Sequence, residues 1–267
     1  MRMVRGLGGQ WRRRYMGAAL PVVVFACALC PADTGTVTYP SAGNIEMREG
    51  TLEMWVSIPF DVQEYLPSDE TYQGLLAIAR IEGEHGTLSL GYCAGAMMRP
   101  GAGLFASLGS DLVQLHSLSA GQFTPLPGEW HHVAVTWSGN RVRYYVDGEM
   151  RGERVTLAPL AQAFGSVGAK PLLLGDPWGR NARMAIDELR VSSVERAPEE
   201  LGWHGRLEVD PYTRILDRFD QTFEIDGETR TSPEVIFVGD GGLPSRHCRF
   251  IDGRFGGALA LYLGGGQ

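Results

Sequence analysis

Apolar and polar residues alternate in short runs along most of the chain. In residues 50–60, Leu52, Met54, Val56 and Ile58 fall on one face of an extended segment. Alternation with a period of two is the pattern of a half-buried strand. Comparable runs, each bounded by Gly, Asp or Ser, follow at 74–81, 87–93, 103–108, 112–118, 171–174 and 184–192. Short strands at this spacing predict an all-β sandwich or barrel rather than a parallel α/β sheet.

The clearest hairpin joins a run at 130–137 to a returning run at 141–146. Directly after the second run, Asp147 and Gly148 form a two-residue turn signal, since such turns need residues that accept positive φ. The pattern predicts one short helix, at 197–203, with proline and an acidic residue in its first turn.

The start of the chain differs from the rest. Residues 1–32 hold five arginines, no acidic residue and an apolar run at 16–29. This is the pattern of a secretory signal peptide, and the run is shorter than the roughly 20 apolar residues of a membrane span. We therefore expect export to the periplasm, the cell surface or the medium, without a stable membrane span. The run Val24–Cys27 also loosely resembles a lipobox, which leaves a lipid anchor at Cys27 open.

The charge of the chain excludes one class of partner. Without the leader, 19 basic residues remain against 31 acidic ones, a formal net charge of −12. Such a surface repels a phosphate backbone, so nucleic acid is not an expected partner. Calcium or neutral sugars are tolerated better.

Two cysteines outside the leader need an explanation. Cys93 and Cys248 lie in strand-like segments that are far apart in the sequence. In an oxidising compartment they could pair, and the sequence leaves open whether they meet. No pair of cysteines has the spacing of a zinc site.

Several blocks, taken in order, resemble one family. They are Gly50–Val56, Gly128–Trp137, Tyr145–Gly148, Leu172–Gly175, and Ile186–Arg190 together with Arg196–Glu200. They are similar to the laminin-G-like domains of the concanavalin A-like lectin and glucanase superfamily. This resemblance implies a jelly-roll sandwich of two antiparallel sheets that holds glycans or partner proteins, sometimes with calcium at its rim. We therefore expect residues 33–205 to be a laminin-G-like β-sandwich.

The C-terminal part departs from the order of that family. A run at 215–220 and a block at 253–261 resemble segments that normally come before the block at Gly50. Residues 206–267 therefore either complete the first sandwich in permuted order or open a truncated second domain. We favour completion, because the leader directly precedes Tyr39 and leaves the sandwich without its usual opening strand.

Most of the aromatic and histidine residues in these blocks have a structural explanation. Trp55, Trp130 and Trp137 are expected in the core, since large aromatic side chains dominate cores. His131 and His132 are strand residues with no third metal ligand nearby in the sequence, so we interpret them as structural.

A binding site is expected in a loop. Trp178 and Asp176 lie in a turn-like segment, and loops carry binding residues more often than strands do. Asp187 and Glu188 begin a strand, and either would be a calcium ligand only at the rim of the sandwich.

One motif favours an enzyme. Glu224, Asp226 and Glu228 match the arrangement of laminarinase-type glycoside hydrolases, in which alternate residues of one strand project two carboxylates about 5 Å apart. Here Gly227 and the residues after it read as a turn, and short matches arise by chance. We therefore predict a binding module for a glycan or an extracellular protein, with a laminarinase-type hydrolase as the alternative.

Overall fold

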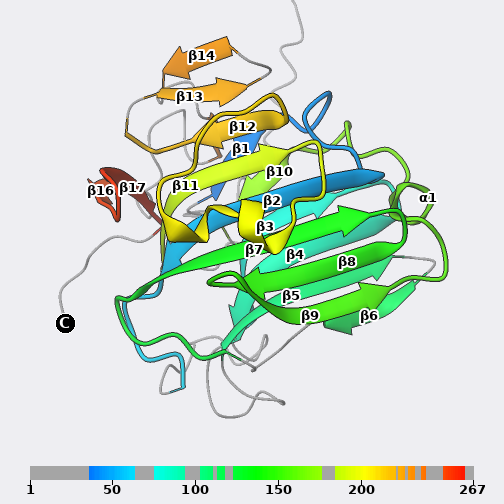
Figure 1. The fold of residues 1–267 in the computed structure, drawn as a ribbon, viewed down its shortest axis with the longest axis horizontal. Coiled ribbons are helices and arrows are strands. Elements are labelled where there is room, and N and C mark those ends of the chain that lie inside the picture. Colours follow the sequence, from blue (N-terminus) through cyan, green and yellow to red (C-terminus); the bar gives the residue numbers. More distant parts are fainter. Residues whose placement is uncertain are drawn as a thin grey trace, which may run out of the picture. The chain divides into compact units, whose positions relative to one another are not determined.

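The computed structural model of the protein describes residues 36–63, 75–93, 103–110, 113–117, 123–175, 184–220, 222–225, 228–231, 236–238 and 249–261. Two antiparallel sheets with an apolar layer between them account for most of these residues (Figure 1). The predicted all-β jelly-roll sandwich is therefore confirmed. The leader lies outside the described residues and stays a prediction. Within the described part of the chain, no helix has the length and apolar character to cross a membrane.

One sheet, sheet A, has seven strands in the order β15-β1-β10-β3-β4-β5-β6. They are β1 (Thr36–Tyr39), β3 (Leu75–Glu82), β4 (Gly86–Cys93), β5 (Gly103–Ser110), β6 (Val113–Ser117), β10 (Leu172–Leu174) and β15 (Ile236–Val238).

The other sheet, sheet B, has the order β14-β13-β12-β11-β2-β7-β8-β9, with β17 also paired to β11 and β16 to β17. Its strands are β2 (Glu49–Ser57), β7 (Trp130–Ser138), β8 (Arg141–Val146), β9 (Glu149–Val155), β11 (Ala185–Ser192), β12 (Thr213–Asp217), β13 (Thr222–Ile225), β14 (Glu228–Thr231), β16 (Arg249–Asp252) and β17 (Gly257–Ala260).

The core lies between the sheets and is built by the predicted alternation. Leu52, Met54 and Val56 of β2 are buried in it, opposite apolar residues of sheet A. The indole ring of Trp137, on the neighbouring β7, packs so tightly on β2 that a Cβ at position 50 would collide with it. Gly50 is therefore required by this close approach.

The predicted hairpin turn is present, whereas the helix differs from its prediction. Asp147 and Gly148 both have positive φ, at 49° and 77°, between β8 and β9. In place of one helix at 197–203 there are two 3₁₀ turns, η2 (Pro198–Glu200) and η3 (Gly202–His204). Leu201 between them is extended, with ψ at 144°, which breaks the helical path. The single α-helix of the described residues, α1 (Leu160–Phe164), was not predicted, because five residues are too few for a periodic signal.

Strands from the C-terminal part pair with strands from the first part. β12 and β17 both hydrogen-bond to β11, and β15 pairs with β1. Ile215, Phe219, Leu259 and Leu261 are buried in the same core as the N-terminal strands. The described strands after residue 206 therefore contribute to this sandwich.

Truncation of the chain after Arg206 should abolish the fold. The change removes four core side chains, and a fully buried large apolar side chain contributes roughly 1.5–3 kcal/mol. Their sum rivals the roughly 5–15 kcal/mol that stabilises a typical domain. Circular dichroism of the shortened chain should show no cooperative thermal transition. An unchanged melting temperature would contradict a structural role for these strands.

Candidate functional site

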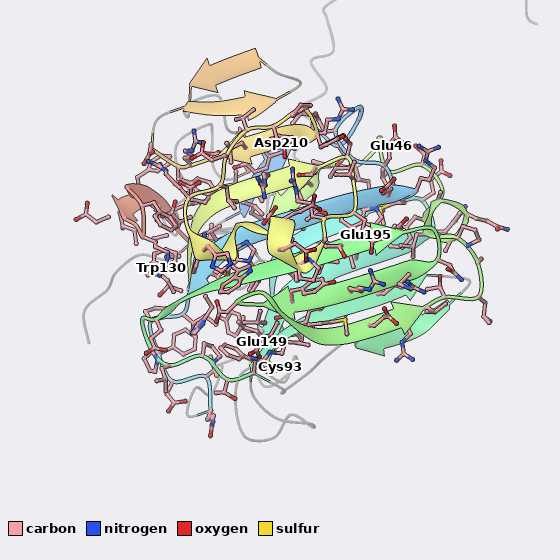
Figure 2. All side chains as sticks on the ribbon, in the orientation of Figure 1. Glu46, Cys93, Trp130, Glu149, Glu195 and Asp210 are labelled. Carbon is pink, nitrogen blue, oxygen red and sulfur yellow. The ribbon has the colours of Figure 1, made fainter. Side chains whose placement is uncertain are left out.

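The two outer faces of the sandwich differ. Part of the outer face of sheet B is covered by residues 194–212, a segment that we call the strap. Figure 1 shows it in yellow in front of β2 and β7. Glu195, labelled in Figure 2, accepts a hydrogen bond at 2.7 Å from Arg143 of β8 and attaches one end of the strap to the sheet. Asp210, also labelled, accepts one at 2.7 Å from Arg196, which joins the two ends of the strap to each other. The β2–β7 part of this face is therefore occupied by the chain itself, while β9 is exposed.

Beneath the strap lies a fully buried carboxylate, that of Glu53. It accepts hydrogen bonds from Arg190 Nε at 2.8 Å and from the backbone N–H of Gly202 at 2.9 Å, and lies 3.0 Å from His132 Nε2. Burial raises the pKa of Glu53, but the hydrogen bond to His132 and the charge of Arg190 outweigh it and lower the pKa to about 2. Glu53 and His132 therefore fix the strap to β2 and β7.

The neighbouring histidine is also bound by a carboxylate. His131 Nδ1 lies 2.8 Å from Asp147 Oδ2, and the other oxygen of Asp147 accepts the backbone N–H of His132. In the described ranges, no group of three His, Cys, Asp or Glu side chains could hold a metal ion. Both histidines thus have structural partners.

The outer face of sheet A presents a row of polar side chains. Strand register aligns Thr38 of β1, Leu173 of β10, Arg80 of β3, Ser89 of β4 and Ser107 of β5 directly across five strands. These positions alternate with core residues, so their side chains point away from the core. All five residues are partly exposed. We call this row the sheet A row.

A cluster of charged side chains lies at the β3 position of this row. Glu82 accepts contacts from Arg80 Nε at 2.6 Å and from Lys170 Nζ at 2.9 Å. The next pair along the sheet joins Glu82 to Thr87, which faces Gly109 on β5. Hydroxyl groups, a carboxylate and two cations therefore share one rigid surface.

The other end of this outer face is covered. Cys93 and Phe105 also point away from the core, yet they are only 2% and 7% exposed. Burial raises the pKa of the Cys93 thiol to about 11, and the thiol is free. Its proposed partner, Cys248, lies outside the described residues. The accessible part of the face is therefore the end with Glu82, Thr87 and Gly109.

The predicted loop site lies outside the described residues. Trp178 and Asp176 belong to residues 176–183, which lie outside the described residues and follow β10 in the sequence. The site at these two residues stays a prediction.

The hydrolase motif does not lie on one strand. Ile225 of β13 pairs with Glu228 of β14 across a hairpin, so Glu224 and Glu228 belong to different strands. Asp226 lies between them, outside the described residues. The hydrolase interpretation requires two carboxylates that alternate along one strand. The backbone places Glu224 and Glu228 on two strands instead.

Asp187 and Glu188 do not lie at an exposed rim, and both are fully buried. Asp187 Oδ2 accepts the backbone N–H groups of Arg254 and Phe255, at 2.8 and 3.0 Å. Glu188 accepts hydrogen bonds from Arg206 Nε and from the backbone N–H of Leu207. The positive φ of Glu188, at 55°, and the bulge around it direct these two neighbouring carboxylates to different partners.

A third buried carboxylate, that of Asp217, lies next in the sheet. Its oxygens accept the hydroxyl of Tyr39 at 2.7 Å and the backbone N–H of Phe219 at 2.7 Å. Burial raises the pKa of Asp217 to about 6 and prevails over these two hydrogen bonds, which act to lower the pKa. The charges of Asp187 and Asp220 make smaller contributions that raise it.

A family model described as the concanavalin A-like lectin/glucanases superfamily matches residues 31–202. The chain belongs to this superfamily. The match includes both outer faces and the strap as far as η3. The matched region ends before the C-terminal strands β12 and β15, which pair with β11 and β1 in this chain.

Solved structures similar to this superfamily member include three from unrelated sources. Domain 4 of an extracellular arabinanase from Geobacillus stearothermophilus, in complex with arabinotriose, is 16% identical, over 62% of this chain and 71% of that one, with a TM-score of 0.42. The CBM40 of a Ruminococcus gnavus sialidase, bound to sialyllactose, is 12% identical, over 64% and 91%, with a TM-score of 0.42. A pentraxin from Limulus polyphemus is 10% identical, over 74% and 84%, with a TM-score of 0.41. Scores this low transfer no ligand to this chain, and no curated protein matches it.

Sequence reasoning missed the sheet A row. The alternation in β4 and β5 does mark Ser89 and Ser107 as outward residues between Leu88, Leu90 and Leu108. The register that aligns them with Arg80 depends on strand pairing, which the alternation of one strand does not contain.

Replacement of Asp217 by Asn should stabilise the protein at neutral pH. Because the folded-state pKa is about 6 against an ordinary 3.8, the ionised carboxylate destabilises the fold on the order of 3 kcal/mol at pH 7. This penalty is complete above pH 6 and vanishes as the pH falls towards 3.8. Urea unfolding should therefore show D217N to be more stable than wild type at pH 7 and similar to it near pH 4.

Asp210 offers a control of opposite sign. Burial acts to raise its pKa, but the hydrogen bonds from Arg196 and Thr213 prevail and lower the pKa. D210N should therefore lose stability at pH 7. A D217N protein that is less stable than wild type at both pH values would contradict the assignment of Asp217.

Proposed function

We propose that this protein is an exported glycan-binding module whose site is the sheet A row and the charged cluster beside it, and that it is not an enzyme. The observation that carries the proposal is the alignment of Arg80, Ser89 and Ser107 on a partly exposed outer face. On the opposite outer face the strap covers β2 and β7, whereas the row on sheet A is partly exposed.

The chemistry of the row suits a polyhydroxylated ligand. Sugar hydroxyls both donate and accept hydrogen bonds, as do Ser and Thr hydroxyls, while Arg80 donates and Glu82 accepts. These groups stand on strands whose backbone is already fixed, so little conformational entropy is lost when a ligand binds. Membership in a superfamily that contains lectins agrees with this use, although fold alone never assigns a ligand.

Export and the loop site belong to the same proposal. The basic and apolar leader supports a place of action outside the cytoplasm. Trp178 and Asp176 directly follow β10, the strand that contributes Leu173 to the row. We propose that Trp178 of this loop adds an aromatic contact to the ligand. Calcium is not assigned as a cofactor, and binding is to be measured with and without it.

Blocking the row should abolish glycan binding. A glycan array, run with and without calcium, would identify the ligand, and calorimetry would then measure its affinity. We expect S89Y to weaken binding at least tenfold, because the bulky ring fills the centre of the row. R154Y, which introduces the same ring on exposed β9, should leave affinity unchanged.

Further variants separate the row from the loop. R80A should weaken binding by removing a donor, and W178A should weaken it only if the loop takes part. Melting temperatures within error of wild type would show that neither change acts through the fold. Full affinity in S89Y would refute the site.

The laminarinase-type alternative can be tested directly. We expect the purified protein to release no reducing sugar from laminarin, since Glu224 and Glu228 lie on different strands. Turnover that disappears in E224Q would overturn the proposal of a binding module and establish the hydrolase.

A further inference from the structure

The β16–β17 hairpin covers an aromatic side chain of sheet B. Arg254, in the turn of the hairpin, places its guanidinium 3.9 Å from the ring centre of Trp55, and Phe255 meets the same ring edge-on at 5.6 Å. Trp55 is only 2% exposed, although it lies on the outer face rather than in the central core. The hairpin thus shields an indole ring from solvent.

Two carboxylates hold the turn of this hairpin. Asp187 Oδ2 accepts the N–H groups of Arg254 and Phe255, and Asp220 Oδ1 accepts the N–H of Gly257 at 2.7 Å. The turn fits closely around the first carboxylate, because a Cβ on Gly253 would lie 2.7 Å from Asp187 Oδ2. β17 adds only two register pairs with β11, at Ala185 and Ile186. β17 is also held by Leu259, which is buried in the core, whereas the carboxylates bind the turn.

Negative charge is in excess around this contact. Four acidic side chains face it: Asp187 and Glu188 from β11, Asp217 from β12 and Asp220 after it. Arg206 pairs with both Glu188 and Asp220, and Arg218 lies 3.7 Å from Glu188 and also contacts Glu208. Tyr39 of β1 donates to Asp217 and brings no charge. Arg254, the cation of the hairpin, is stacked on Trp55.

One oxygen of this group has no partner. Asp187 Oδ1 is buried and accepts no hydrogen bond. An unpaired buried polar atom is unfavourable, and an ionised one much more so. Protonation of Asp187 would remove the charge while Oδ2 continues to accept the two backbone N–H groups.

We propose that the turn of the β16–β17 hairpin, residues 253–257, is a pH-dependent latch: it docks over Trp55 while Asp187 is neutral and releases as ionisation of Asp187 adds to the negative charge of its neighbours, while Leu259 of β17 stays in the core. The direction follows from linkage. Burial raises the pKa of Asp187 in the docked state and prevails over the N–H groups of Phe255 and Arg254, which act to lower it. The charge of Asp220 adds to the rise, whereas release returns the carboxyl to water. A group that binds its proton more tightly when docked favours docking at low pH and opposes it at high pH. Asp217, with its pKa raised to about 6 by burial, acts in the same direction.

Hydrogen exchange of the full-length protein tests the latch. The amides of Arg254, Phe255 and Gly257 would be followed at pH 5 and pH 8, after correction for intrinsic exchange rates. We expect their protection to fall about tenfold for each unit by which docking raises the pKa of Asp187. Amides of β8 should keep their protection at both pH values, and an equal loss there would indicate global unfolding and refute the latch.

Charge-neutral variants give the matched controls. D187N keeps an oxygen that accepts the two N–H groups and removes the charge, so its hairpin amides should be equally protected at both pH values. If D187N does not fold, D217N should reduce the dependence of hairpin protection on pH, because the hydrogen bonds of Asp217 are to Tyr39 and Phe219 and not to the hairpin. D210N removes a carboxylate from the strap and should keep the wild-type dependence of hairpin protection on pH.

A second readout follows Trp55 itself. The fluorescence of Trp55 is obtained as the difference between the wild type and W55F. Iodide should quench this fluorescence more strongly at pH 8 than at pH 5. Two results would overturn the latch. One is hairpin protection that does not change with pH in the wild type, and the other is a D187N protein whose hairpin protection depends on pH as in the wild type.

Discussion

A charged side chain that is fully buried must be paired, and the carboxylate of Glu53 is the buried charge on which the outer face of sheet B depends. It lies on β2, the strand between β7 and β11, and draws one partner from each neighbour: His132 and Arg190. Its third partner is the N–H of Gly202 in the strap. Loss of one partner would leave a buried charge uncompensated, which typically destabilises a protein by about 3–5 kcal/mol. The strap is therefore part of the fold rather than a loose loop.

This constraint separates the two sides of the sandwich. Where the strap lies, Leu201 and Trp203 pack against Ala134 and Tyr145 and form a second, smaller apolar cluster. Sheet A has no equivalent strap among the described residues, and its outward positions on β3, β4 and β5 are mostly small or polar. The two outer faces thus differ because sheet B carries a buried carboxylate, Glu53, that binds the strap over β2 and β7, whereas the row on sheet A stays partly exposed.

The C-terminal strands follow a different physical rule. They too meet the sheet through buried carboxylates, but Asp187 and Asp217 lack the cations that balance Glu53. The pKa of Glu53 is accordingly lowered to about 2 by its partners, whereas burial raises that of Asp217 to about 6. The strap stays attached at pH 7 because the charge of Glu53 is compensated. The attachment of the C-terminal strands is favoured when Asp187 and Asp217 are protonated.

The sequence by itself determined the strands, the turn at Asp147 and Gly148, the all-β sandwich and the resemblance that the family match confirms. These features are local: alternation, turn residues and short ordered blocks are contained in contiguous segments. Only the tertiary structure decided that Glu224 and Glu228 lie on two strands, that Asp187 and Glu188 are buried, and that Arg80, Ser89 and Ser107 form one row. Strand order and register bring together residues that are distant in the chain. The burial and charge that set the chemistry of a carboxylate come from those distant neighbours rather than from its own segment.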